Sequence, residues 1–132
     1  MNRPSGHDPL NLIGGEWLPA GDGGEISVVN PATEEVIGRA PASSAADVDR
    51  AVAAAKRAFP AWRDAAPQER ARLLTGLADL IDEHADELAE LESLNVGKPR
   101  PMAAEEIPIC SDSLRFLAGA ARAMWAPAAG EY

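Results

Sequence analysis

The chain has 132 residues, enough for one domain, and 46% of them are apolar. Its formal net charge of −9 at pH 7 excludes the basic surface that a nucleic-acid partner requires, and it disfavours an anionic membrane. No apolar run approaches the ~20 residues that span a bilayer, so no membrane partner is expected. The first residues also lack the apolar stretch of a secretion signal. A single cysteine excludes an internal disulfide, which fits a cytoplasmic location.

The first third of the chain predicts short strands joined by tight turns. Residues 1–9 are predicted to be a disordered lead, followed by one segment over 10–132. Gly14-Gly15 is a hairpin signal between two short apolar runs. At Asn30-Pro31 the asparagine can hydrogen-bond the backbone ahead of it, while the proline presets the next backbone angle. The predicted strands cover residues 10–13, 16–18, 26–29 and 35–40.

The first predicted helix begins at a capping box. Ser44 is followed three residues later by Asp47, an acceptor for the exposed first-turn amides. Val48, Ala51, Val52, Ala55 and Phe59 then recur at helical spacing, and Pro60 is expected to end the helix.

Two longer helices follow. The second is predicted to start at Pro67 and run to Val96, with a break near His84 because of its length. Gly97 supplies a left-handed cap and Pro99 prevents continuation. The third is predicted over 103–124, distorted near its start by Pro108. Leucines at helical spacing are expected to form the buried stripe of the second helix: Leu73, Leu74, Leu77, Leu80, Ile81, Leu88 and Leu91.

Residues that suggest chemistry are better explained structurally. Cys110 has no predicted histidine neighbour to lower its pKa, so a buried structural thiol is expected. Lys98 is expected to be a charge at the end of a helix. The glycines at 21, 23 and 24 precede a strand and not a helix, which excludes a dinucleotide loop. His7 and His84 lack the spacing of a zinc site.

Two segments identify a family resemblance: Val29-Asn30-Pro31-Ala32-Thr33-Glu34-Glu35-Val36 and Leu91-Glu92-Ser93-Leu94-Asn95-Val96-Gly97-Lys98-Pro99. With the helices between and after them, they resemble the N-terminal segment of NAD(P)-dependent aldehyde dehydrogenases, from about Leu12 to Tyr132. The resemblance implies an α/β fold. This segment would supply a small β-hairpin element and three main helices that flank the cofactor domain, ending before the oligomerisation arm.

The resemblance implies an enzyme that oxidises an aldehyde with NAD or NADP. The family's catalytic cysteine and glutamate and its cofactor turn have no matching positions in this chain. The chain alone is therefore expected to bind no cofactor and to be catalytically incompetent. Its expected partners are the remaining cofactor and catalytic domains, within a homo-oligomer.

Three further stretches are similar to the aminobutyraldehyde dehydrogenase group: 105–108, 115–122 and 128–132. In relatives that act on ω-amino aldehydes, acidic residues on this helix line the substrate entrance. The resemblance therefore implies that Glu106, with Glu105 as second candidate, attracts the ammonium group of the substrate. By themselves, these carboxylates fit the first turn of a helix.

The resemblance also implies a site for a monovalent cation. Many family members hold one with backbone carbonyls beside the Asn-Pro turn and an acidic residue before the Gly-Lys-Pro stop. The matching positions are Val28, Val29 and Asn95, where asparagine replaces the usual aspartate and removes its charge.

Two alternatives remain open from sequence. The first is a non-catalytic helical interaction module derived from the same scaffold. The second is a small enzyme built on Cys110, which the lack of a nearby base disfavours.

Overall fold

The computed structural model describes residues 10–123, and these form two compact units. Within the described residues, the first unit comprises 10–63 together with Leu94–Gly97. The second unit comprises Asp64–Ser93 and residues 98–123. The lead predicted over 1–9 and the final stretch of the resemblance, 128–132, lie outside the described residues.

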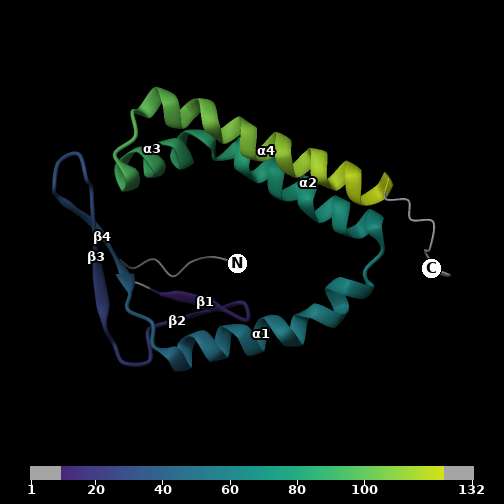
Figure 1. The fold of residues 1–132 in the computed structure, drawn as a ribbon, viewed down its shortest axis with the longest axis horizontal. Helices are drawn as coiled ribbons and strands as arrows, with labels where there is room; N and C mark the ends of the chain where they lie inside the picture. The colour runs from purple at the N-terminus through teal and green to yellow at the C-terminus, as the bar shows by residue number, and fades with distance from the viewer. Residues whose placement is uncertain (1–9, 124–132) are drawn as a thin grey trace. The chain divides into compact units, whose positions relative to one another are not determined.

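The first unit contains two separate antiparallel strand pairs (Figure 1). Strands β1 (Asn11–Ile13) and β2 (Glu16–Leu18) form a hairpin, as the sequence predicted. Its Gly14 and Gly15 both have positive φ. Strands β3 (Glu25–Val29) and β4 (Val36–Pro41) form the second pair, which has a register irregularity between Val28 and Val29.

The turn between β3 and β4 forms as predicted. Asn30 is buried, and its Oδ1 accepts a hydrogen bond of 2.9 Å from the Ala32 amide. The Asn30 amide donates to the Glu35 carbonyl at 2.9 Å. Glu34 adopts a positive φ of 62°, unusual for a residue with a side chain. The buried side chain of Asn30 therefore stabilises the turn.

Helix α1 (Ala45–Asp64) starts at the predicted capping box but extends past its predicted end. The Asp47 amide donates to Ser44 Oγ at 3.3 Å, and the Asp47 carboxylate accepts from the Ser44 amide at 2.8 Å. The prediction that Pro60 ends the helix was wrong, because Pro60 lies inside it. The φ angle of proline is compatible with a helix, but Pro60 has no amide hydrogen to donate to the Lys56 carbonyl. Lys56 and Pro60 are both exposed, so water can satisfy that carbonyl.

The second unit is helical. Helix α2 (Pro67–Glu83) and helix α3 (Ala85–Val96) are separated at His84, which confirms the predicted break. Helix α4 (Arg100–Ala123) begins earlier than predicted, because Pro101 is tolerated in its first turn. Pro108 lies within α4.

Helices α2 and α4 run side by side (Figure 1) through a stripe of small residues. The buried residues of the two helices are Ala71, Ala78, Ala103, Ser111 and Ala118. The predicted leucine stripe is buried only in part. Leu74, Ile81 and Leu88 are half-buried. The other members are exposed: Leu73, Leu77, Leu80 and Leu91. Small side chains let helix backbones approach closely, and this leaves the bulkier residues on the flanks. The pairing therefore leaves large apolar side chains uncovered.

Candidate functional site

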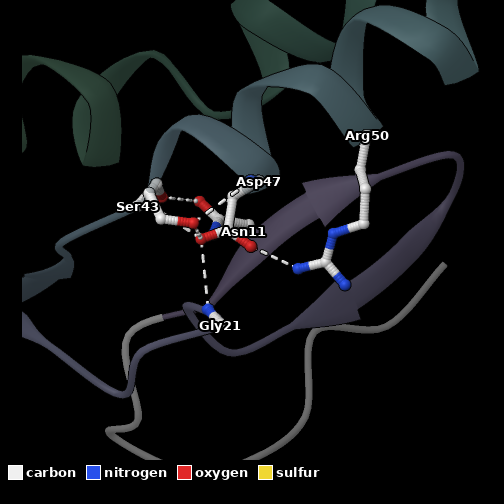
Figure 2. Close-up of polar contacts among 6 residues, drawn as sticks. Asn11, Gly21, Ser43, Asp47 and Arg50 are labelled. Atoms are coloured by element: carbon white, nitrogen blue, oxygen red, sulfur yellow. Dashed lines mark hydrogen bonds and ion pairs between the residues drawn. The ribbon is translucent and has the colours of Figure 1, made fainter.

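The most heavily hydrogen-bonded side chain of the first unit is Asp47, which is only 2% exposed (Figure 2). Besides the Ser44 amide, its carboxylate accepts hydrogen bonds from Ser44 Oγ at 3.0 Å and from the Gly21 amide at 3.1 Å. It also forms an ion pair with Arg50. The Ser44 amide, followed by Gly21 and Arg50, holds the pKa of Asp47 well below its ordinary value.

These contacts give Asp47 a structural role and not the role of an acid–base catalyst. The carboxylate stays ionised at neutral pH and joins the β2–β3 loop to the start of α1. The sequence predicted its capping role, but it contained no signal for the bond to Gly21, which is distant along the chain. Beside Asp47, Ser43 Oγ donates to Asn11 Oδ1 at 2.9 Å (Figure 2).

Lys98 lies just beyond α3 and links two helices. Its ammonium donates to Glu92 of α3 at 3.0 Å and to the Glu106 carboxylate of α4. Glu106, and then Glu92, raise the pKa of Lys98 above its ordinary value. The Lys98 carbonyl accepts a hydrogen bond from Ser93 Oγ at 2.7 Å. The expected charge at the helix end is therefore a specific ion-pair partner of the α4 carboxylate.

The two candidate entrance carboxylates lie in different environments. Glu106 is paired with Lys98, whereas Glu105 is exposed and makes no hydrogen bond or ion pair within residues 10–123. Their expected place in the first turn was wrong, because α4 starts at Arg100 and its first turn holds no acidic residue. A favourable interaction with the helix dipole is confined to the first turn, so it does not explain this pair of carboxylates.

Two arginines fasten α4 to its neighbours in the second unit. Arg115 contacts Asp79 and Asp82 of α2, each at 2.7 Å. Asp79, followed by Asp82, raises the pKa of Arg115, while Ser111 and then Arg115 lower the pKa of Asp82. Arg100 contacts the carboxylates of Asp86 and Glu90 at 3.1 and 3.2 Å. Sequence reasoning missed these pairs because they depend on how the helices align.

The two segments that carry the family resemblance meet in the first unit. Gly97 has a φ of +71°, and a Cβ placed on it would lie 2.9 Å from Pro31 Cγ and 3.7 Å from the Ala32 amide nitrogen.

Of the cation candidates, Asn95 is exposed in the last turn of α3, and Val28 and Val29 flank the strand irregularity. The cation site at Val28, Val29 and Asn95 stays a prediction.

Cys110 is exposed, so the prediction of a buried thiol was wrong. The neighbouring Ser111 occupies the buried side of α4, and one residue of helix rotation turns Cys110 toward solvent.

Among residues 10–123 there is no cluster of His, Cys, Asp and Glu suited to a metal. None of the described helices is long and apolar enough to cross a membrane.

A family model described as the aldehyde dehydrogenase family matches residues 17–129. Malonate-semialdehyde dehydrogenase 1 of Geobacillus kaustophilus is 42% identical over 83% of this chain, which spans only 22% of that relative. The NADP-dependent succinate-semialdehyde dehydrogenase GabD of Escherichia coli is 41% identical over 81% of the chain and 22% of its own length.

Solved structures agree with this match. A complex of PnpE with nicotinamide adenine dinucleotide has a TM-score of 0.83 and 45% identity, covering 89% of this chain and 24% of that protein. An NAD-dependent aldehyde dehydrogenase from Sinorhizobium meliloti has a TM-score of 0.83 and 43% identity over the same shares. These relatives support the expected fold and the family, but they do not support the aminobutyraldehyde subgroup.

Proposed function

Because the chain belongs to the aldehyde dehydrogenase family, we propose that it is the N-terminal segment of an enzyme that oxidises an aldehyde to an acid with NAD or NADP. The observation that carries this proposal is the match over residues 17–129, which spans under a quarter of the relatives' length. The segment serves as scaffold, and the catalytic nucleophile, base and cofactor turn are supplied by the remaining domains. The complete enzyme is a cytoplasmic homo-oligomer in this proposal.

Uncovered apolar side chains support a scaffold that packs against further protein. Met102, Ile109 and Phe116 recur every seven residues and therefore lie on one face of α4. All three are exposed, and Phe116 is 73% exposed. Contiguous apolar patches on a monomer mark surfaces that contact other protein. A free-standing interaction module would need the same face, so activity must decide between the two functions.

Replacing the matched segment of the Geobacillus kaustophilus enzyme with this chain is expected to give an active fusion. The 132-residue chain alone is expected to form no NADH from malonate semialdehyde or aminobutyraldehyde. Loss of one oxyanion donor already costs about 10²–10³ in rate, and the chain lacks the covalent nucleophile as well. The measurement is NADH formation by the purified proteins.

The control is the same enzyme without its N-terminal segment. A folded but inactive fusion would contradict the scaffold role and favour the interaction module. Turnover that follows the isolated chain through repeated purification would show that it carries its own catalyst.

For the substrate, we propose an ω-amino aldehyde, with Glu105 as the main attracting carboxylate. Lys98 compensates the charge of Glu106, whereas Glu105 is exposed and free of partners within the described residues. This reverses the order in which the resemblance ranked the two residues. Malonate and succinate semialdehydes, named for the relatives above, carry a carboxylate that Glu105 would repel.

In the active fusion, Glu105→Gln is expected to raise KM for aminobutyraldehyde several-fold and to lower KM for succinate semialdehyde. The variant keeps the size of the side chain and removes its charge. Because the carboxylate is exposed, solvent screening keeps the effect small. The kcat values should stay nearly constant, since only ground-state binding changes. Steady-state kinetics with both substrates measure this difference.

Glu106→Gln is the matched control and should change KM for either substrate less than Glu105→Gln. If Glu105→Gln leaves the ratio of the two KM values unchanged, the amino-aldehyde proposal fails while the enzyme family stands. A neutral aliphatic aldehyde should respond to neither variant.

A further inference from the structure

A groove of about 650 Å³ lies between α2 and α4 within the second unit. Its floor is formed by the buried Ala71 and Ala118. Gly76 of α2 and Gly119 of α4 line it, and a Cβ at either glycine would meet nothing within 4 Å. The small residues that bring the helices together therefore also leave open space between their outer edges.

Three arginines line this space: Arg72 of α2 and Arg115 and Arg122 of α4. We call it the arginine groove. Arg115 and Arg122 are seven residues apart, so they lie on the same face of α4, about 10 Å apart along its axis. Gln68 and Thr75 of α2 add an amide and a hydroxyl to the lining. A cationic groove is unexpected in a chain whose net charge is −9.

The charge of the arginine groove is only partly compensated. Arg115 is held by Asp79, which also lines the groove, and by Asp82. Arg72 and Arg122 make no hydrogen bond or ion pair within residues 10–123. Most other arginines within residues 10–123 have such a partner, so two arginines without a compensating carboxylate line the same groove.

We propose that the arginine groove binds a small oxyanion with at least two anionic oxygens, such as inorganic phosphate or a polycarboxylate. Arg72 and Arg122 supply charge-assisted hydrogen bonds from opposite helices, and Arg115 is already oriented by its two aspartates. One guanidinium group can donate two parallel hydrogen bonds to two oxygens of the same carboxylate or phosphate. The glycines leave the room that the anion occupies. The site needs none of the groups that oxidise an aldehyde.

The test is a titration of the full ¹⁵N-labelled chain with inorganic phosphate, and separately with citrate, followed by NMR. Sodium chloride at matched ionic strength is the reference. The amide signals of Gly76 and Gly119 are expected to shift saturably with at least one of the two anions. Arg72→Gln and Arg122→Gln should each weaken binding about tenfold, which is the scale of one charged hydrogen bond. Saturation by only one anion would support the site and identify its preferred ligand class.

Arg57→Gln is the matched control, because Arg57 lies on α1 and also makes no hydrogen bond or ion pair within residues 10–123. It changes the net charge equally and should leave the affinity unchanged. Gly119→Glu places a carboxylate in the open space and should abolish binding without removing an arginine. The proposal is overturned if sodium chloride reproduces the shifts, or if Arg57→Gln weakens binding as much as Arg72→Gln does.

Discussion

Replacing Asp47 with asparagine is expected to lower the Tm of the chain by about 10 °C. The carboxylate is 2% exposed and accepts hydrogen bonds from Ser44 and Gly21 while pairing with Arg50. Asparagine removes the charge and turns an NH₂ group toward amides that also donate. Buried donors then lose their acceptor, which is among the costlier defects in a folded chain. Thermal unfolding followed by circular dichroism measures the change.

The destabilisation by Asp47→Asn is also expected to depend on pH. The folded pKa of Asp47 lies below its ordinary value of 3.8. The stability that the carboxylate contributes is therefore complete above the unfolded pKa and is lost as pH falls toward the folded pKa. The gap between wild type and variant should be constant above about pH 5 and should narrow below about pH 4.

Arg50→Met provides the comparison for this prediction. It removes one half-exposed partner and leaves the bonds from Ser44 and Gly21 in place. Its effect should be clearly smaller than that of Asp47→Asn. Equal effects would mean that the ion pair, and not the buried backbone bonds, carries the contribution of Asp47.

Gly97→Ala is expected to destabilise the first unit by about 2–4 kcal/mol, for two separable reasons. The φ of +71° lies in the left-handed region, which disfavours any residue with a Cβ. In addition, the new methyl group would lie 2.9 Å from Pro31 Cγ, closer than carbon atoms normally approach. Urea denaturation measures the free energy of unfolding.

Gly23→Ala separates the cost of the backbone conformation from the cost of the clash with Pro31. Gly23 has a similar φ of +66°, but nothing lies within 4 Å of its Cβ position. Its substitution should therefore cost only the backbone term, about 1 kcal/mol. Pro31→Ala removes the clashing carbon and should recover part of the loss when combined with Gly97→Ala. Additive effects in this double-mutant cycle would exclude a direct contact between the two residues.

Local signals in the sequence predicted the elements well because they act over a few residues. The Gly14-Gly15 hairpin, the Asn30-Pro31 turn, the Ser44 cap and the break at His84 all form as expected. The end of α1 was missed because Pro60, which has no amide hydrogen to donate, is still tolerated inside this helix. These successes and failures concern the backbone alone.

The burial of side chains was harder to predict because it depends on which face meets a neighbour. Leu73 and Ala71 lie on different faces of α2, and periodicity favours the leucine, whereas the pairing with α4 buries the alanine. The candidate site shows the same limit. The family resemblance suggested Glu105 and Glu106 as candidates, but only the structure gives Lys98 as the partner of Glu106.

The contact between Gly97 and Pro31 has a consequence for the order of folding. These residues belong to the same unit, yet α1, α2 and α3 lie between them in the chain. A ribosome releases the β3–β4 turn long before it releases the loop that rests on it. The first unit therefore stays incomplete during synthesis until α3 has emerged, and its closure requires a long-range contact of the kind that slows folding.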